Sequence, residues 1–319
     1  MLDRERLSDG TEGCPRFQAA AAPTDKKGAL AGPSAKRARF CGTLAPPVPS
    51  TLWKFGPRSG RAGGALSRKS LLLSVRNAYE ALAISVPTVI DGVRGRLSQR
   101  ECDARLETFA AHVMRNAEIA VSVRGRENLG GPQSSRGGAD AGARTYVVMS
   151  NHQSHYDVPV LYYVLGGRMR MVAKKELFAL PVFGRALRDS GMIEVDRGNR
   201  QRAIASLGEA KKQLESGTQI WIAPEGTRST TGELLPFKKG GFVLALDINA
   251  PILPITIKGT RDVLPSHGMF SRRGVEVFVT IHPPIETSAF APRSSSASDT
   301  KAARDALMNE VRLAIASAL

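Results

Sequence analysis

The chain has 319 residues, and its 45 Lys and Arg against 29 Asp and Glu give a net charge of +16. Hydrophobic residues make up 42% of the sequence, which excludes a chain that is disordered throughout. No uninterrupted apolar run reaches the roughly 20 residues of a membrane-spanning helix, so a polytopic membrane protein is also excluded. The positive charge indicates an anionic partner: a nucleic acid, an anionic membrane or a phosphorylated small molecule.

The three cysteines, Cys14, Cys41 and Cys102, lie far apart. This spacing predicts neither a structural zinc site nor a secreted disulfide fold, and it favours a reducing compartment. Acidic residues stand where a secretory signal would have its basic segment, and no apolar segment follows them, so we expect no signal peptide.

Residues 1–65 are rich in Ala, Gly, Pro, Ser and basic residues and have no helical or strand periodicity. They are predicted to form a disordered basic tail. Its short basic cluster at 36–39 is interpreted as part of a solvated tail, with phosphate or lipid contact as the alternative.

Residues 66–95 are predicted to form an amphipathic helix with a basic entry, which Pro87 ends or kinks. The pattern fits two locations for this helix: it lies in a membrane interface, or it packs its apolar stripe on the rest of the protein. The stripe consists of Leu72, Val75, Tyr79, Leu82 and Val86.

A second helix is predicted to begin at Ser98, because Ser98 and Glu101 have the spacing of a capping box. Leu97 stands where a hydrophobic staple would pack. One face of this helix then carries Leu106, Phe109, Ala110, Val113, Met114 and Ala117. Residues 66–118 are therefore predicted to form a two-helix element.

From residue 119 the sequence alternates strand and helix patterns. A helix is predicted over 199–216, ended by Gly217, and a surface loop over 130–143. This alternation predicts an α/β fold with a mixed, mostly parallel sheet flanked by helices. Residues 288–319 are predicted to be a linker and a C-terminal helix. The predicted strands lie at 119–128, 146–149, 169–173, 192–195, 219–223, 252–257 and 275–281.

A candidate site follows the strand at 146–149: Asn151-His152-Gln153-Ser154-His155-Tyr156-Asp157. If a helix begins near Ser154, Asp157 can fold back onto the imidazole of His152. A carboxylate that accepts one ring N–H fixes the tautomer and leaves the other nitrogen as a base. The pair suits deprotonation of a substrate hydroxyl that attacks an acyl group.

Three other interpretations of this segment stay open. His152, His155 and Asp157 have the residue types of a metal site, although their spacing matches no metal signature that we recognise. A Ser–His–Asp triad would need a nucleophile elbow, and the chain contains no Gly-x-Ser-x-Gly. The third interpretation is a helix-capping Asp with surface histidines.

Further polar groups follow other predicted strands. Pro224-Glu225-Gly226-Thr227-Arg228-Ser229 offers a tight turn at Gly226 and a guanidinium suited to phosphate. Lys174-Lys175 follow the strand at 169–173. The segment 191–197 contains the strand at 192–195 and ends in Arg197. Basic groups at several strand ends fit a polyanion held over one edge of the sheet, although each alone is typical of a solvated charge.

Four blocks of the sequence resemble the sequence blocks of the glycerolipid acyltransferases, the family of 1-acyl-sn-glycerol-3-phosphate (lysophosphatidic acid) acyltransferases, and they occur in that family's order. The blocks are 151–157, 191–197, 224–229 and 250–255. The first block has that family's Asn-His-x-Ser-x-x-Asp pattern, the HX4D motif. The resemblance covers about residues 70–285. It implies an acyltransferase domain over 119–287 and a membrane-associating element over 66–118.

The resemblance implies an enzyme of phospholipid biosynthesis that moves a fatty acyl group from acyl-CoA or acyl-carrier protein to the sn-2 hydroxyl of 1-acyl-sn-glycerol-3-phosphate, forming phosphatidic acid. His152 would be the general base and Asp157 its orienting partner. The acceptor site would be formed by Lys174, Arg197, Glu225, Gly226, Thr227 and Arg228. It implies no metal and no cofactor, and a monotopic enzyme on the cytoplasmic face of an anionic membrane surface.

Other function classes remain as alternatives. Related enzymes that acylate other lysolipids, such as lyso-ornithine lipid, share similar blocks. A hydrolase would use His152 to activate water against an acyl thioester. A non-catalytic binding module for nucleic acid or anionic membrane also fits the charge, but 6% aromatic residues and no zinc-finger spacing disfavour nucleic acid as a partner.

Overall fold

A seven-stranded sheet forms the centre of the part of the chain that the structure describes. That part of the computed structural model comprises residues 69–130, 144–196, 200–292, 294 and 296–319. The predicted tail at 1–65, nearly all of the predicted loop at 130–143, and Arg197 lie outside the described residues. The strands, in sheet order, are β1 (Ala120–Arg124), β7 (Glu276–Ile281), β6 (Ile252–Lys258), β2 (Val147–Ser150), β5 (Gln219–Ile222), β3 (Met169–Lys174) and β4 (Ile193–Val195).

Neighbouring strands are parallel except for the antiparallel pair β6 and β7. In the register of the sheet centre, Val147 lies between Ile220 and Ile252. Strands buried on both faces are typical of parallel sheets, and every residue of β2 is buried. The predicted mixed, mostly parallel sheet is confirmed.

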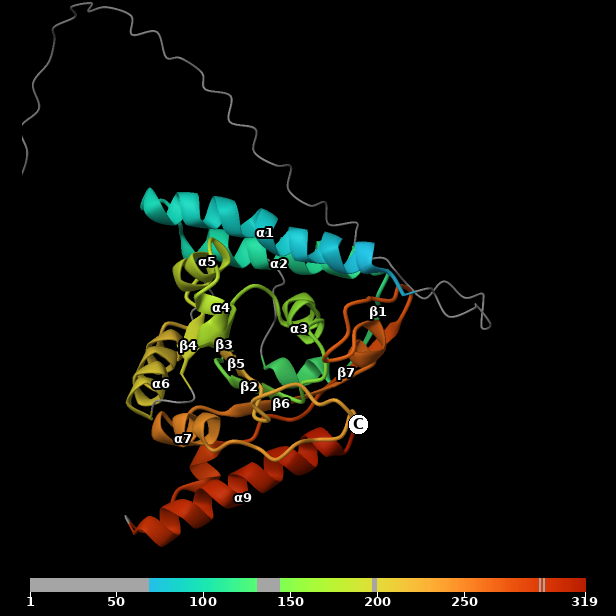
Figure 1. Cartoon of the computed structure of the whole chain (residues 1–319). Helices are drawn as coiled ribbons and strands as arrows, with labels where there is room; N and C mark the ends of the chain where they lie inside the picture. The colour runs from blue at the N-terminus through green and yellow to red at the C-terminus, as the bar shows by residue number, and fades with distance from the viewer. Residues whose placement is uncertain (1–68, 131–143, 197–199, 293, 295) are drawn as a thin grey trace, which may run out of the picture. The chain divides into compact units, whose positions relative to one another are not determined.

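Helices cover both faces of this sheet (Figure 1). One face carries α2 (Gln99–Asn116), α3 (Asp157–Leu165), α4 (Lys175–Phe178) and α5 (Phe183–Asp189), with α1 (Leu71–Val93) across α2 and α5. The other face carries α6 (Arg200–Glu215), α7 (Gly240–Asp247) and α9 (Ala297–Ala316). The short elements are α8 (Thr260–Val263) and the 3₁₀ helices Arg126–Leu129 and Thr287–Phe290.

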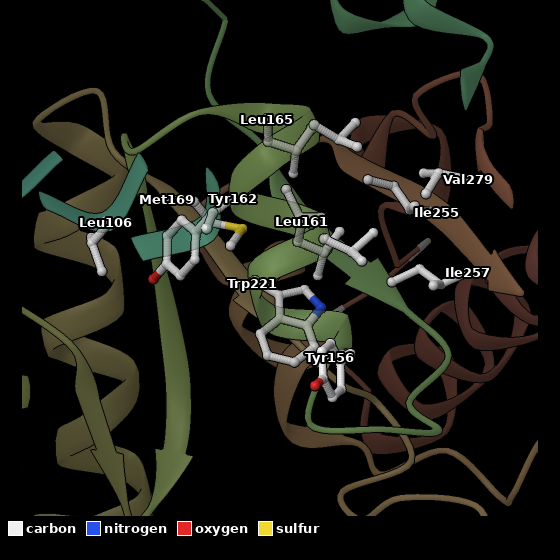
Figure 2. Close-up of a cluster of buried hydrophobic side chains, with 14 of the residues drawn as sticks. Leu106, Tyr156, Leu161, Tyr162, Leu165, Met169, Trp221, Ile255, Ile257 and Val279 are labelled. Carbon is white, nitrogen blue, oxygen red and sulfur yellow. The ribbon is translucent and has the colours of Figure 1, made fainter. Parts of the chain in front are cut away.

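Two hydrophobic cores lie on the two faces because side chains alternate along each strand. Val148 belongs to the core beneath α2 and α3, which also contains Leu161 and Trp221 (Figure 2). Val147 belongs to the opposite core, where α9 buries Leu307, Val311 and Ile315. The C-terminal helix is thus part of the packing of the sheet.

The predicted helix starts and stops are largely confirmed. Ser98 and Glu101 form the capping box of α2, and Gly217 takes a left-handed φ of 85° after α6. Pro87, however, does not end α1, which continues to Val93. On either side of it, the hydroxyls of Ser85 and Thr88 donate to the carbonyls of Ala81 and Ile84, so both side chains are satisfied inside the helix.

The face of α1 that packs on the protein is largely polar, although it also buries Leu73 in the hydrophobic core. Arg105 of α2 pairs with Asp91 of α1, and Asn116 Nδ2 donates to Asn77 Oδ1 and Glu80 Oε1, both at 3.1 Å. The predicted apolar stripe lies on the opposite side: its five side chains are between 43% and 76% exposed. The alternative in which this stripe packs on the rest of the protein is therefore wrong for these residues.

Candidate active site

The loop Asn151–Tyr156 leaves the carboxyl end of β2, in the middle of the sheet. The Asn151 side chain continues the sheet pairing beyond β2: its Nδ2 donates to the Ile257 carbonyl, and its Oδ1 accepts the Ile257 N–H, both at 2.8 Å. Further along the loop, Ser154 Oγ donates to the Leu264 carbonyl at 2.7 Å. The loop is therefore tied to β6 and to the segment that follows α8. Sites in open α/β folds lie at this edge of the sheet.

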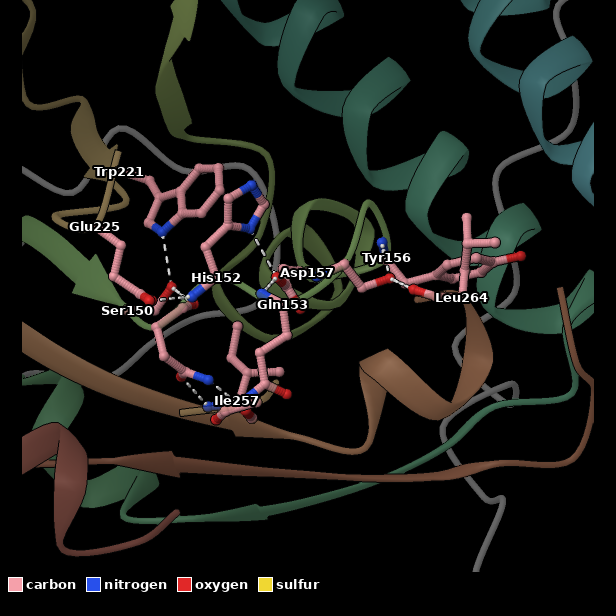
Figure 3. Close-up of polar contacts among 12 residues, drawn as sticks. Ser150, His152, Gln153, Tyr156, Asp157, Trp221, Glu225, Ile257 and Leu264 are labelled. Carbon is pink, nitrogen blue, oxygen red and sulfur yellow. Dashed lines mark hydrogen bonds and ion pairs between the residues drawn. The ribbon is translucent and has the colours of Figure 1, made fainter. Parts of the chain in front are cut away.

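His152 and Asp157 form the predicted pair (Figure 3). His152 Nδ1 lies 2.7 Å from Asp157 Oδ2, which also accepts the N–H groups of Gln153 (2.7 Å) and Ser154 (2.9 Å). Asp157 is fully buried in the first turn of α3, where a carboxylate is favoured by the helix dipole. Because Asp157 accepts from it, Nδ1 of His152 is assigned as the protonated ring nitrogen, and Nε2 of His152 is left as a base.

Trp221 of β5 fixes the other side of the imidazole. Its ring meets that of His152 edge to face, with centroids 5.5 Å apart and planes at 85°. Trp221 Nε1 donates to Ser150 Oγ at 2.9 Å, which holds the indole in place. No sequence signal pointed to this tryptophan beyond its place in the strand that precedes the second polar block.

Glu225 braces the loop. Its two carboxylate oxygens accept the backbone N–H groups of His152 (2.7 Å) and Leu235 (2.9 Å). Burial raises the pKa of this carboxyl, and the two backbone donors act in the opposite direction. Both carboxylate oxygens accept backbone N–H groups, so Glu225 supports the loop in this structure. The sequence had instead predicted that Glu225 contacts the acceptor.

The turn after Glu225 packs against the first block. Gly226 has a φ of 74°, a left-handed conformation that glycine adopts without strain. Ser229 N–H donates to the His152 carbonyl at 2.8 Å, so the loops after β2 and β5 form one unit. Thr227 is exposed on this turn.

Arg228 places a half-buried positive charge near the pair. In the part of the chain that the structure describes, its guanidinium has no hydrogen-bond or ion-pair partner. Burial lowers its pKa, and the charge of Asp157 opposes that effect. A half-buried, unpaired guanidinium is suited to bind a phosphate with two parallel hydrogen bonds.

His155 lies within the electrostatic range of Arg228 and Lys174. His155 is exposed at the surface of the loop, yet partial desolvation, followed by the charge of Arg228, lowers its pKa to about 4. Lys174, the last residue of β3, is exposed, whereas its neighbour Lys175 pairs with Asp196 at 3.0 Å. Of the predicted cations, Lys174 and Arg228 therefore face the same region, and Arg197 lies outside the described residues.

The alternative metal site has no support in the side-chain arrangement. Among the described residues, no three His, Cys, Asp or Glu side chains are grouped so that they would hold a metal ion. His152 and Asp157 instead contact each other directly. The arrangement thus provides a base with an oriented tautomer beside an unpaired cation.

Known proteins are similar to this chain in sequence. The model of the acyltransferase family matches residues 120–258. The 1-acyl-sn-glycerol-3-phosphate acyltransferase alpha of Homo sapiens is 34% identical over 201 residues, which cover 63% of this chain and 66% of that protein. The 1-acyl-sn-glycerol-3-phosphate acyltransferase of Saccharomyces cerevisiae is 35% identical over 181 residues, or 55% of each protein. The matched part of the chain thus spans less than two thirds of either relative.

A solved structure matches about three quarters of the chain. The crystal structure of the 1-acyl-sn-glycerophosphate (LPA) acyltransferase PlsC from Thermotoga maritima matches with a TM-score of 0.56 and 25% sequence identity. The match covers 76% of this chain and 95% of that one.

Proposed function

We propose that the protein moves a fatty acyl group from a thioester to the sn-2 hydroxyl of 1-acyl-sn-glycerol-3-phosphate, forming phosphatidic acid. The match of residues 120–258 to the model of the acyltransferase family supports this proposal. The observation that carries the proposal is the 2.7 Å contact between His152 Nδ1 and Asp157, with Arg228 unpaired nearby. The names of the relatives from Homo sapiens and Saccharomyces cerevisiae support this acceptor.

The proposed reaction uses His152 Nε2 as the base. It takes the proton of the acceptor hydroxyl as that oxygen attacks the thioester carbonyl, and the C–O bond forms. The tetrahedral intermediate then breaks its C–S bond, and the imidazolium gives its proton to the leaving sulfur, so that a thiol departs and His152 Nε2 is again a free base. Asp157 holds the ring and stabilises its positive charge in between. No metal or cofactor takes part in this sequence.

In this proposal the phosphate of the acceptor binds to Arg228, with Lys174 and Arg197 as further cations. Gly226 and Thr227 form the turn that approaches the acceptor, and Glu225 holds that turn against the His152 loop. Acyl-CoA and acyl-carrier protein are both suitable donors, because the chemistry at His152 depends only on the thioester.

We further propose that the enzyme is monotopic and binds the cytoplasmic face of an anionic membrane surface. The support is α1, whose exposed stripe of Leu72, Val75, Tyr79, Leu82 and Val86 faces away from the protein. A helix that offers its polar face to its own protein leaves its apolar face for lipid. Within the described residues, no helix is both long and apolar enough to span a bilayer.

Product analysis tests the proposed function. The full chain is incubated with acyl-CoA or acyl-carrier-protein thioesters and a panel of lysolipids that includes lysophosphatidic acid and lyso-ornithine lipid. Phosphatidic acid as the main product supports the proposal and identifies the donor. If only another lysolipid is acylated, that lysolipid is the acceptor in place of lysophosphatidic acid. Release of free fatty acid alone would indicate a hydrolase, and salt-sensitive DNA binding without turnover would indicate a nucleic-acid binding module.

A further inference from the structure

Tyr156 stands immediately before Asp157, and its hydroxyl contacts α1. Asn77 Nδ2 of α1 donates to this hydroxyl at 2.7 Å, and the hydroxyl donates to Ser271 Oγ at 3.0 Å. Burial raises the pKa of the Tyr156 phenol, so the hydroxyl stays protonated near neutral pH and remains a donor. The ring is 4% exposed, so these two contacts are shielded from water.

Ser271 is itself held by the start of α1. Its carbonyl accepts the Ser70 N–H at 2.8 Å, and its N–H donates to the Ser70 carbonyl at 3.2 Å. The hydroxyls of Ser74 and Ser271 are 2.8 Å apart. Both partners of the Tyr156 hydroxyl therefore belong to α1 or are fastened to its first turn.

The backbone of Tyr156 belongs to the loop that orients the base. Its N–H donates to Ser154 Oγ at 3.2 Å, and the Ser154 N–H is one of the three donors to Asp157 Oδ2. Asp157 follows directly and holds His152 Nδ1. A displacement of Tyr156 would therefore displace the carboxylate that orients the imidazole.

We propose that Tyr156 is a positioning residue through which the binding of α1 to a phospholipid bilayer sets the geometry of the His152–Asp157 pair. This inference rests on the proposed function. The apolar stripe of α1 faces outward while Asn77 faces the protein, so a bilayer that orders the stripe also orders Asn77 and the Ser70–Ser271 contact. The base is then best aligned when the enzyme lies on the membrane that contains its acceptor.

The test compares two acceptors in the full chain and in Tyr156→Phe, which keeps the ring and removes the hydroxyl. One acceptor is short-chain lysophosphatidic acid below its critical micelle concentration, and the other is long-chain lysophosphatidic acid in phosphatidylcholine–phosphatidylglycerol vesicles. We expect the ratio of kcat on vesicles to kcat on the monomeric acceptor to fall about fivefold or more in Tyr156→Phe. Vesicle binding, measured by co-sedimentation, should not change.

Tyr146→Phe is the matched control, because Tyr146 is a buried tyrosine like Tyr156 and its hydroxyl makes a long contact, 3.4 Å, with the Leu129 carbonyl. Its kcat ratio should match that of the original chain. Asn77→Ala removes the same hydrogen bond from the α1 side and should lower the kcat ratio as Tyr156→Phe does. If Tyr156→Phe does not fold, Asn77→Ala alone provides the test. An unchanged ratio in both variants, or an equal fall in Tyr146→Phe, would overturn the inference.

Hydrogen exchange supplies a readout that needs no turnover. In the original chain, vesicles should slow exchange of the Gln153 and Ser154 amides, which donate to Asp157, and Tyr156→Phe should abolish this effect. If the original chain transfers no acyl group to any lysolipid, the proposed function fails while this measurement still tests the coupling. Exchange that responds equally to vesicles in both proteins would overturn it.

Discussion

Asp157 holds three donors on one carboxylate oxygen: the His152 imidazole and two backbone N–H groups of the same loop. Its position at the start of α3 adds the helix dipole to these contacts. The imidazole is confined further by Trp221 and by the Glu225 contact with its own backbone N–H. His152 therefore has little freedom to rotate, which is what a base that must meet a hydroxyl requires.

Replacing Arg228 by Ala should impair acceptor binding more than any other step. A charged hydrogen bond to phosphate contributes about 1.5–3 kcal/mol, which corresponds to a roughly 10- to 150-fold rise in the KM for lysophosphatidic acid. Steady-state kinetics with varied acceptor measures this. Arg304→Ala, on α9 at the opposite face of the sheet, is the matched control. If Arg228→Ala leaves the acceptor KM and kcat unchanged, Arg228 does not bind the phosphate.

Replacing His155 by Gln should reduce the loss of stability in mild acid. Because the pKa of His155 is about 4 in the folded protein and 6.5 ordinarily, the unfolded chain binds this proton more tightly, and its contribution to stability is lost as pH falls from about 6.5 to 4. Urea unfolding at pH 7, 5.5 and 4 should show a shallower decline for His155→Gln. His282, whose pKa burial also lowers, keeps some slope in both proteins. Parallel declines would contradict this assignment.

The sequence could predict the His152–Asp157 contact because both residues lie in one turn, where local spacing decides the geometry. It could not predict the support for that contact. Glu225 joins the N–H groups of residues 152 and 235, and Trp221 reaches Ser150 from another strand. Such contacts depend on the order of strands in the sheet, which no local pattern contains. The acceptor-binding roles of Gly226 and Thr227 stay predictions.

At the scale of elements, most predicted strands and helices appear at nearly the predicted positions, since each rests on its own periodicity. The strand predicted over 119–128 is the exception, because β1 ends at Arg124 and Arg126–Leu129 form a 3₁₀ helix. Their order in the sheet, β1-β7-β6-β2-β5-β3-β4, was beyond prediction because parallel neighbours are joined by long crossovers. For α1, hydrophobic spacing identified which residues share a face. It could not show that the polar face would pack on α2, because that depends on the matching polar residues of α2, such as Arg105, His112 and Asn116.

The exposed stripe of α1 predicts a specific defect in lipid binding. Val75→Asp places a charge where we expect contact with acyl chains. Loss of one fully buried apolar side chain costs about 1.5–3 kcal/mol, so vesicle affinity should fall about tenfold or more. Because Val75 is 56% exposed, the thermal stability of the free protein should change little.

Co-sedimentation with anionic vesicles measures that affinity. Leu313→Asp is the matched control, since Leu313 is an apolar residue of α9 with 58% exposure. We expect it to bind vesicles like the original chain. Equal binding by Val75→Asp and the original chain would show that α1 does not contact lipid.

At the scale of the whole molecule, charge and packing divide the chain into parts with different tasks. Residues 1–65 hold 11 basic and 5 acidic residues, a net +6, which leaves +10 for residues 66–319. In the proposed function that charge attracts the protein to an anionic bilayer and holds a phosphorylated acceptor. On the sheet, α1 and α2 lie over one face and α9 closes the other (Figure 1). The helix proposed to bind lipid therefore lies on the same face as α3, whose first residue is Asp157.

The measurement that tests the central claim most directly is acyl transfer to vesicle-embedded lysophosphatidic acid by His152→Ala in the full chain, beside the original protein. Loss of the base should lower kcat by about 10²- to 10⁴-fold. The circular dichroism spectrum and melting temperature should be nearly unchanged, since 18% of the His152 side chain is exposed and Asp157 keeps its two backbone donors. We predict phosphatidic acid from the original chain and almost none from the variant. Turnover by a folded His152→Ala protein close to that of the original would contradict the assignment of His152 as the base.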